Sequence, residues 1–427
     1  MSDSAFKKTT LDNGLRVVSK QLDGTQAVTV LVLTGAGSRY EEQSNRGLSH
    51  FLEHMFFKGG ERFKNAKEVS ETVDSVGGEF NAFTGKEYAG YYVKVAHENT
   101  DTAFDVLSDM MMNARFEQAE IDKERGVILE EYNMYQDTPM YQIGWQFENM
   151  AFGDQPLGWD EIGLKDVIRT VNQEDFAKYK KDLYATDNIV IAVSGNIDHE
   201  TVLEKVAKFF PMEKSEHAFD FKAYDGTKGV ERVVVKEKKT EQAHLAVGVE
   251  AYAETDDDHW VLKVLSVILG GNMSSRMFLN VREAHGLAYY VRTSTDNYMD
   301  TGLISTTAGV DVSRAHMAVE KIVEQYKIIS EEDVSEAELA KGKNYLKGKM
   351  VLGLEDSEEY AHLLAKYELL HKDPKTPEEI MAGIDKVTVA DVRRVASELF
   401  QPERLKFTII GPFGADDKAK FEELLKW

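Results

Sequence analysis

The chain reads NIVIAVSGN at residues 188–196, a run of β-branched residues that ends in a glycine turn and predicts a buried strand. A similar stretch, LKFTIIGP, stands at residues 405–412. The helix starts that precede these strands also match, since VNQEDF begins at residue 171 and VTVADV at residue 387. Both pairs lie 216 residues apart (171 to 387, and 195 to 411), which indicates that the chain contains two copies of one fold.

Other segments support two homologous halves. FEQAE at residues 116–120 corresponds to VSEAE at residues 334–338, and both open a predicted long helix with acidic residues in its first turns. We therefore predict an N-terminal domain over residues 1–212 and a homologous C-terminal domain over residues 230–427. The segment 213–229 is polar and contains two glycines, so it is predicted to be the linker.

Predicted strands and helices mix within the N-terminal half. Strands are expected at residues 15–20, 28–33 and 88–95, and helices from about residue 45, over 66–76 and from residue 101. Ser44 or Asn45 is expected to cap the first of these helices. Helices clustered between hairpin-linked strands indicate an α+β fold, in which each half is a mostly antiparallel sheet with helices packed on one face.

Composition narrows the classes of function. The formal net charge of −23 would repel nucleic acid and anionic membranes and favours basic ligands, although acidic surfaces also serve solubility. The absence of cysteine excludes disulfides and thiolate metal sites. Residues 1–8 lack the apolar stretch of a secretory signal, and no apolar run is long enough to cross a membrane. A cytoplasmic protein of a bacterium is therefore the expectation.

The strongest local signal is HFLEH at residues 50–54. On a helix His50 and His54 lie on one face, so both imidazoles can bind one metal ion. Glu53 points close to the same face and can take a proton from a metal-activated water molecule. This H-x-x-E-H order is the inverzincin signature of zinc hydrolases.

A third metal ligand should come from another helix. The segment ERGVILEE at residues 124–131 offers Glu124 and Glu131 on one helical face, two turns apart, while Glu130 points about 100° away from Glu131. Spacing alone leaves the choice open, because an acidic run of this kind is more often a solvated helix face.

The chain resembles the M16 metallopeptidases, the family of pitrilysin and mitochondrial processing peptidase, in several motifs that follow one another along its whole length. The context GLSHFLEHMFFKG at residues 47–59 matches the zinc motif of that family. The resemblance implies that Glu131, which follows His54 by 77 residues, is the third ligand of one Zn²⁺ per chain, together with His50 and His54. It also implies that Glu124 supports the metal site or assists catalysis.

A second segment of the N-terminal half resembles the part of the family that binds substrate. GGEFNAFT at residues 77–84 is similar to the edge strand that pairs with the substrate backbone. The resemblance implies that Asn81, Ala82 and Phe83 bind substrate. Without it, the two glycines would indicate only a turn before a strand.

The C-terminal half contains a third matching segment. REAHGLAY at residues 282–289 resembles the arginine–tyrosine segment of the family, which implies that Arg282 and Tyr289 contact substrate and take part in catalysis by stabilising the tetrahedral intermediate. Taken alone, a solvated arginine and a packed tyrosine would be the simpler interpretation.

Comparison of the two halves predicts that the second lacks a metal. When the helix at 45–57 is aligned with the predicted helix at 257–269, the H-x-x-E-H positions fall on Leu262, Leu265 and Ser266. At the offset of 218 residues that relates FEQAE to VSEAE, Glu131 falls on Lys349. The C-terminal domain is therefore expected to keep the scaffold without the metal ligands.

These features predict a zinc-dependent endopeptidase that cleaves unfolded peptides or presequence-like segments inside a clam-shell chamber, with Glu53 as general base. The chain has the size of the small-subunit members of the family, in which two chains form the clam-shell. Because one chain carries both the zinc motif and the Arg282–Tyr289 pair, a homodimer is expected. The alternatives are a non-catalytic peptide-binding clamp and one subunit of an obligate heterodimeric processing peptidase.

Overall fold

Two compact units make up the computed structural model, which describes residues 6–228 and 231–427. Of the described residues, unit 1 comprises 6–133, 160–222 and 351–377, and unit 2 comprises 134–159, 223–228, 231–350 and 378–427. Each unit contains one β-sheet. The predictions for residues 1–5, and for residue 229 at the end of the linker, lie outside the described residues.

The sheet of unit 1 has the strand order β1-β2-β6-β3-β5-β4. Neighbouring strands are antiparallel except β2 and β6, which are parallel. Strand β4 stands at the end of this order and pairs with β5 alone, so one of its edges is open. The strands are β1 (Lys7–Thr10), β2 (Arg16–Gln21), β3 (Ala27–Thr34), β4 (Glu79–Thr84), β5 (Ala89–Ala96) and β6 (Ile189–Gly195).

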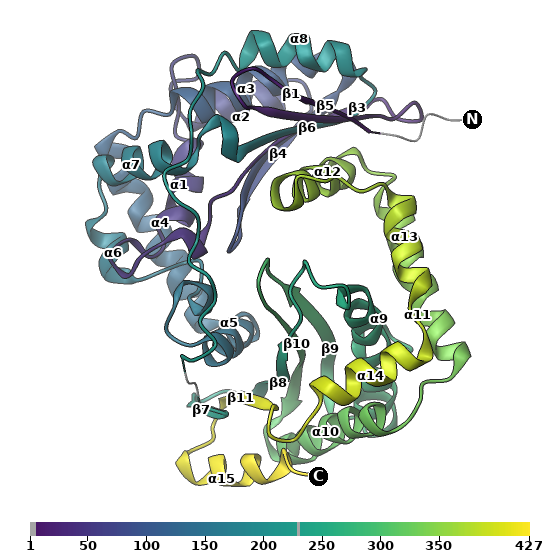
Figure 1. Cartoon of the computed structure of the whole chain (residues 1–427). Coiled ribbons are helices and arrows are strands. Elements are labelled where there is room, and N and C mark those ends of the chain that lie inside the picture. Colours follow the sequence, from purple (N-terminus) through teal and green to yellow (C-terminus); the bar gives the residue numbers. More distant parts are fainter. Residues whose placement is uncertain (1–5, 229–230) are drawn as a thin grey trace. The chain divides into compact units, whose positions relative to one another are not determined.

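Helices cover both faces of this sheet, with α3 and α8 on one face and α12 on the other (Figure 1). Ala361 and Leu364 of α12 pack against Leu31 and Leu33 of β3, and all four side chains are buried. The helices that contribute to unit 1 are α1 (Leu48–Phe56), α2 (Ala66–Asp74), α3 (Thr100–Asn113), α4 (Gln118–Asp137), α6 (Lys165–Thr170), α7 (Gln173–Leu183), α8 (His199–Phe209) and α12 (Ser357–His371).

The sheet of unit 2 repeats this pattern with the order β7-β11-β8-β10-β9. Strands β7 and β11 are parallel and the other pairs antiparallel, as in unit 1. The predicted α+β halves with mostly antiparallel sheets are therefore confirmed. Helices cover both faces of the first sheet rather than one, because α12 comes from the other half of the sequence. The strands are β7 (Val233–Glu237), β8 (Gln242–Ala251), β9 (Ala288–Asn297), β10 (Gly302–Asp311) and β11 (Lys406–Gly411).

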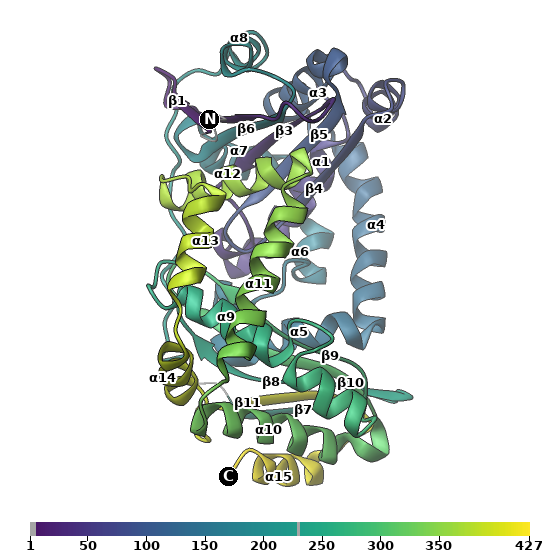
Figure 2. The same ribbon diagram turned by 90° about the vertical axis from the view of Figure 1, so that its right-hand side faces the viewer.

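Helix α5 packs on one face of the second sheet, through contacts with β8 and β11, and α10 and α15 lie on the opposite face (Figure 2). Phe147 and Met150 of α5 are buried against Ala246 and Ile410 of the sheet. The helices that contribute to unit 2 are α5 (Pro139–Phe152), α9 (His259–Gly270), the π-helix η6 (Phe278–Ala284), α10 (Ala315–Glu331), α11 (Glu336–Gly353), α13 (Pro377–Lys386), α14 (Val389–Leu399) and α15 (Ala415–Leu424).

The two repeated stretches adopt equivalent structures. NIVIAVSGN forms β6 and LKFTIIGP forms β11, each fully buried along the strand core and each beside a parallel neighbour. The preceding helices begin alike, because Asn172 caps α7 and Thr388 caps α14, each in a capping box with an aspartate three residues later. The repeat predicted from the sequence therefore corresponds to two structurally equivalent helix–strand segments.

The compact units do not follow the predicted boundaries at residues 212 and 230. Residues 134–159 belong to unit 2 and residues 351–377 belong to unit 1, so each half of the sequence contributes one helical segment to the other unit. The exchange is symmetric, because α5 and α12 begin 218 residues apart (139 to 357), like α4 and α11 (118 to 336). The physical reason is that each exchanged helix buries its apolar side chains on a sheet built mainly from the other half.

Candidate metal centre

Helix α1 begins immediately after Gly47, later than the sequence indicated. Ser44 and Asn45 do not cap it, and the prediction of either as its cap is wrong. The buried carboxylate of Glu41 serves instead, since it accepts hydrogen bonds from the backbone N–H groups of Gly47 at 2.8 Å and Ser49 at 2.7 Å. Burial raises the pKa of Glu41 to about 8, and the hydrogen bonds from Gly47 and Ser49 only partly offset this effect.

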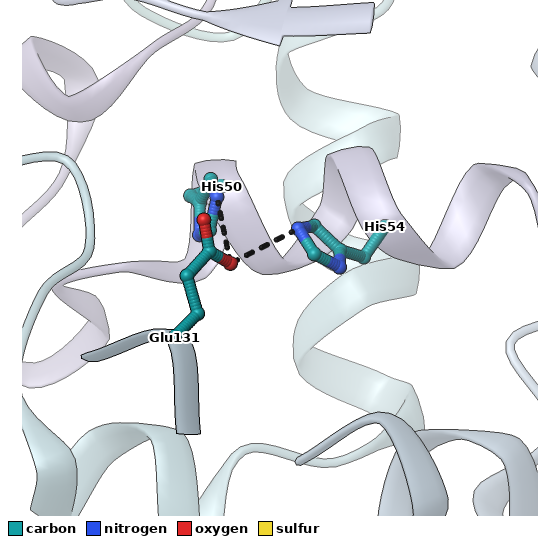
Figure 3. A group of neighbouring side chains, drawn as sticks. All are labelled: His50, His54 and Glu131. Atoms are coloured by element: carbon teal, nitrogen blue, oxygen red, sulfur yellow. Dashed lines mark ion pairs between the residues drawn. The ribbon is translucent and has the colours of Figure 1, made fainter. Parts of the chain in front are cut away.

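Three side chains converge on one point between α1 and α4 (Figure 3). Nε2 of His50 lies 3.7 Å, and Nε2 of His54 3.6 Å, from the same carboxylate oxygen of Glu131. Two ligand atoms that each lie about 2.1 Å from a tetrahedral zinc ion are about 3.4 Å apart. The donor set and its spacing therefore fit Zn²⁺. Among the described residues, this is the one group of three or more His, Asp or Glu side chains whose ligand atoms lie close enough together to hold one metal ion.

His50 is held in the neutral form that binds a metal. Burial, and secondarily the neighbouring His54, lowers the pKa of His50 to about 3. Its Nδ1 atom is buried without a hydrogen-bond partner, whereas its Nε2 atom points towards Glu131. A neutral imidazole with an available nitrogen is a metal ligand at neutral pH.

Glu124 orients the second histidine from α4. Nδ1–H of His54 donates to Oε1 of Glu124 at 2.9 Å, which leaves Nε2 for the metal. The other oxygen of Glu124 lies 2.5 Å from the ammonium of Lys58. Burial alone would raise the pKa of Glu124, but the hydrogen bonds from His54 and Lys58 outweigh it and lower the pKa, so the group stays anionic. Such carboxylate–histidine contacts fix the ring and its tautomer in metal sites.

Glu53 lies beside the same face of α1 and contacts the edge strand. The hydroxyl of Thr84, the last residue of β4, donates to Oε2 of Glu53 at 2.5 Å. Burial raises the pKa of Glu53, and the hydrogen bond from Thr84 partly offsets this effect. The proposed base and the proposed substrate strand are thus joined by a direct contact.

The predicted substrate residues Asn81, Ala82 and Phe83 all lie on β4. Asn81 is exposed and the other two are half-buried. The ring of Phe83 packs on His362 of α12, with ring centroids 5.0 Å apart. The exchanged helix α12 therefore supports the open strand from the side opposite α1, where Phe80 of β4 contacts Phe57.

Arg282 and Tyr289 lie in unit 2, whereas the three converging metal-site residues lie in unit 1. Within unit 2 the two side chains are neighbours, because the Arg282 guanidinium lies 5.9 Å from the centroid of the Tyr289 ring. Arg282 belongs to the π-helix η6, and Tyr289 of β9 is 75% exposed. Both side chains are therefore placed on a surface where a ligand could reach them.

Helix α9 carries no metal-binding side chains at the positions equivalent to the metal motif of α1. At the positions equivalent to His50, Glu53 and His54, α9 carries Leu262, Leu265 and Ser266, all of which are buried. These side chains belong to the packed interior of unit 2 and offer no strong metal ligand.

Sequence reasoning missed three residues that hold the site together, namely Glu41, Lys58 and Thr84. Lys58 and Thr84 stand inside quoted motifs, but nothing in a helical or strand pattern says which distant side chain they meet. Glu41 had a weak signal, as an acidic residue shortly before a helix.

Comparison with known proteins agrees with this geometry. Residues 16–159 match the family Insulinase (Peptidase family M16), and residues 170–346 match the family Peptidase M16 inactive domain. A protein of Streptomyces coelicolor, named as an uncharacterized zinc protease, is 35% identical over 95% of this chain and 89% of its own length. The chain belongs to peptidase family M16.

Other M16 relatives cover the chain as completely. An uncharacterized zinc protease of Bacillus subtilis is 34% identical over 96% of this chain and 99% of its own length. The crystal structure of a protease from Helicobacter pylori has a TM-score of 0.86 and 27% identity, and the match covers 96% of this chain and 99% of that one. A Pseudomonas fluorescens structure described as a peptidase M16 inactive domain, at 15% identity and a TM-score of 0.88, shows the same fold.

Membership of this family supports the general function of a zinc peptidase. None of the helices in residues 6–228 and 231–427 has the length and apolarity that crossing a membrane requires. A cytoplasmic location remains a prediction.

Proposed function

We propose that this M16 protein is a zinc-dependent endopeptidase that binds one Zn²⁺ per chain through His50, His54 and Glu131 and uses Glu53 as general base. The observation that carries the proposal is the convergence of the three donor atoms within 4.8 Å of one another. The hydrogen bond between Glu53 and Thr84 of the open strand β4 supports it, because it links a carboxylate on the histidine-bearing helix to the strand that we propose binds peptide.

The zinc ion, when bound, supplies Lewis-acid activation of a water molecule and of the scissile carbonyl. Glu53 takes a proton from the attacking water and delivers it to the leaving amine. Its raised pKa, caused by burial, makes it a stronger base than an exposed glutamate. Glu124, held by Lys58, keeps the His54 ring in the orientation that presents Nε2.

The substrate in this proposal is an extended peptide. An extended chain can add to the open edge of β4 through backbone hydrogen bonds, and Asn81, Ala82 and Phe83 would then contact its side chains. Unfolded peptides and presequence-like segments meet this requirement, whereas folded domains do not. The net charge of −23 favours basic peptides.

The Arg282–Tyr289 pair completes the proposal through a second copy of the chain. In this proposal two chains form a clam-shell homodimer. Arg282 and Tyr289 of one chain contact the substrate that is held at the zinc site of the other chain. The support is the resemblance to the small-subunit members of the family, together with the exposure of Tyr289. An obligate heterodimer with a separate partner subunit is the competing arrangement.

The test compares wild type with Glu53→Gln, measuring metal content and cleavage of a quenched fluorescent peptide library. We expect about one zinc per chain in both proteins and a fall in kcat of at least about 10³-fold in Glu53→Gln. Glu130→Gln is the matched control, since Glu130 is an exposed neighbour of Glu131 on α4. It should cleave like wild type.

The same experiment separates the competing functions. Cleavage that persists in Glu53→Gln would refute Glu53 as the base. If wild type binds zinc and peptide but cleaves nothing, the chain is a peptide-binding clamp or requires a partner subunit. Zinc binding that survives the triple change His50→Ala, His54→Ala and Glu131→Ala would refute the metal site itself.

A further inference from the structure

A separate cavity of about 580 Å³ lies in unit 1, between the end of α3, the helix α7 and the segment that follows α8. None of the metal-site or substrate-strand residues lines it. Its walls are mainly apolar, with side chains of Met111, Phe116, Tyr184, Ile189 and Met212. A volume of this size is in the range of sites that bind small molecules.

The charged groups around the cavity are mostly cationic. Arg115, Lys180 and Lys181 line it, against the single carboxylate of Glu213. This balance is opposite to that of the whole chain, which has 51 basic and 74 acidic residues. Arg115 lies 3.3 Å from a carboxylate oxygen of Glu117, so Lys180 and Lys181 supply the local positive charge, which favours an anionic ligand.

Lys180 is the group that enters the cavity from α7. Its ammonium donates one hydrogen bond, of 2.9 Å, to the carbonyl oxygen of Met112. An ammonium has three N–H donors, so it has capacity for further acceptors. Burial lowers the pKa of Lys180 to about 8, and no acidic group is among the causes that act on it. An anion at this point would compensate the charge that burial penalises.

We propose that this cavity binds a small amphipathic carboxylate, with the carboxylate on Lys180 and the apolar body against Met111, Phe116 and Met212. An uncharged apolar molecule would leave the remaining N–H donors of the Lys180 ammonium without acceptors in apolar surroundings. A fully polar anion would leave the apolar walls in contact with water. A carboxylate attached to an alkyl or aryl body satisfies both parts of the cavity.

The primary test is a calorimetric titration of the full chain with decanoate at pH 7, beside 1-decanol as the matched uncharged probe. We expect one decanoate site per chain, with decanol binding more weakly. Lys180→Met keeps the apolar stem and removes the charge, and should weaken decanoate binding about tenfold while leaving decanol unchanged. Lys178→Met is the matched control, since Lys178 lies on the same helix, pairs with Asp182 and does not line this cavity.

A second variant keeps the proposal testable should Lys180→Met fold poorly. Ala177 is exposed on α7 and lines the cavity, so Ala177→Trp fills the space without opening the interior. It should reduce the binding of both probes. Decanoate should also slow the acetylation of Lys180 by acetic anhydride, measured by mass spectrometry, and should leave that of Lys178 unchanged.

The outcomes are distinct. Decanoate affinity that is the same in wild type, Lys180→Met and Ala177→Trp would overturn the proposal, as would undetectable binding in wild type. The expected loss in both variants, with Lys178→Met unchanged, would support it. None of these readouts depends on zinc or on cleavage, so the result is independent of the proposed peptidase activity.

Discussion

At the scale of single residues, four carboxylates around α1 differ in what they contact and hence in what they can do. Glu131 faces two imidazole nitrogens, and Glu124 holds the far side of His54. Glu53 meets only a hydroxyl from the edge strand among its described hydrogen bonds, and Glu41 accepts two backbone N–H groups. The same type of side chain thus serves as a proposed metal ligand, an orienting group, a proposed base and a helix cap.

The orienting contact predicts a metal-affinity effect. Glu124→Gln loses the charge that holds both His54 and Lys58, so zinc affinity should fall about 10- to 100-fold. A competition titration with a zinc chelator measures this directly. Glu130→Gln, which changes an exposed carboxylate on the same helix, should leave the affinity within about twofold of wild type. Equal affinities in wild type and Glu124→Gln would show that the His54 contact does not support the metal.

At the scale of secondary-structure elements, the start of α1 depends on a residue outside the helix. Gly47 has φ 92°, a left-handed conformation that favours glycine, and this turn presents its N–H to Glu41. Glu41→Ala would leave two buried N–H groups without acceptors, which should lower the free energy of unfolding by about 2 kcal/mol or more. Zinc affinity should also fall, because both histidines follow within two turns.

Chemical denaturation of the zinc-free protein measures the first effect, and a chelator competition measures the second. Glu42→Ala is the control, since Glu42 is exposed and adjacent in sequence. If Glu41→Ala unfolds at the same denaturant concentration as Glu42→Ala, the cap does not stabilise the helix.

The linker contains a contact that depends on pH. In residues 213–222, the His217 ring lies 2.9 Å from a carboxylate oxygen of Asp187 and 3.1 Å from one of Asp220. Burial alone would lower the pKa of His217, but the hydrogen bonds and charges of the two aspartates outweigh it and raise the pKa. The stabilisation is fully present below the unfolded pKa of about 6.5. It is lost as the pH rises through the raised folded pKa.

Hydrogen exchange of residues 213–222 should therefore be slower at pH 6 than at pH 8.5, after correction for the intrinsic chemical rate. His217→Gln keeps a hydrogen-bonding side chain that does not titrate and should remove most of this difference. A corrected exchange rate that stays constant with pH in the wild type would contradict the prediction.

At the scale of the whole molecule, the metal ligands and the Arg282–Tyr289 pair belong to different units. If two chains share their sites as proposed, Arg282→Ala and Glu53→Gln are each inactive alone but complement one another in a heterodimer. One of the two sites then has an intact base and an intact arginine. With random pairing of equal amounts, about half of the dimers are mixed, so about a quarter of the wild-type rate should return.

The measurement is peptide cleavage after the two variants are mixed and allowed to exchange subunits, with each variant alone as the control. Full activity of Arg282→Ala by itself would remove Arg282 from the mechanism. Absence of recovery, once mass measurements show that mixed dimers have formed, would contradict shared sites.

Much of the fold and of the candidate site could be predicted from local patterns. The strands β6 and β11, the helix starts that precede them, and the helix that carries His50 and His54 depend on residues close together in sequence. The periodicity of a helix or strand depends on residues that are neighbours in sequence, so it can be recognised without knowledge of the tertiary structure. The selection of Glu131 required a family resemblance, because spacing on α4 allowed more than one carboxylate.

Contacts between distant residues were decided only by the tertiary structure. Local sequence patterns predicted two similar halves, their element types and a helix with the histidine spacing of a metal site. The packing of α5 and α12 on the sheet of the other half could not be predicted from the sequence, because an apolar stripe on a helix does not specify which sheet will bury it. The Glu41 cap, the Lys58–Glu124–His54 contacts and the Thr84–Glu53 bond have the same origin, since a polar side chain acquires its partner only when packing brings the two together.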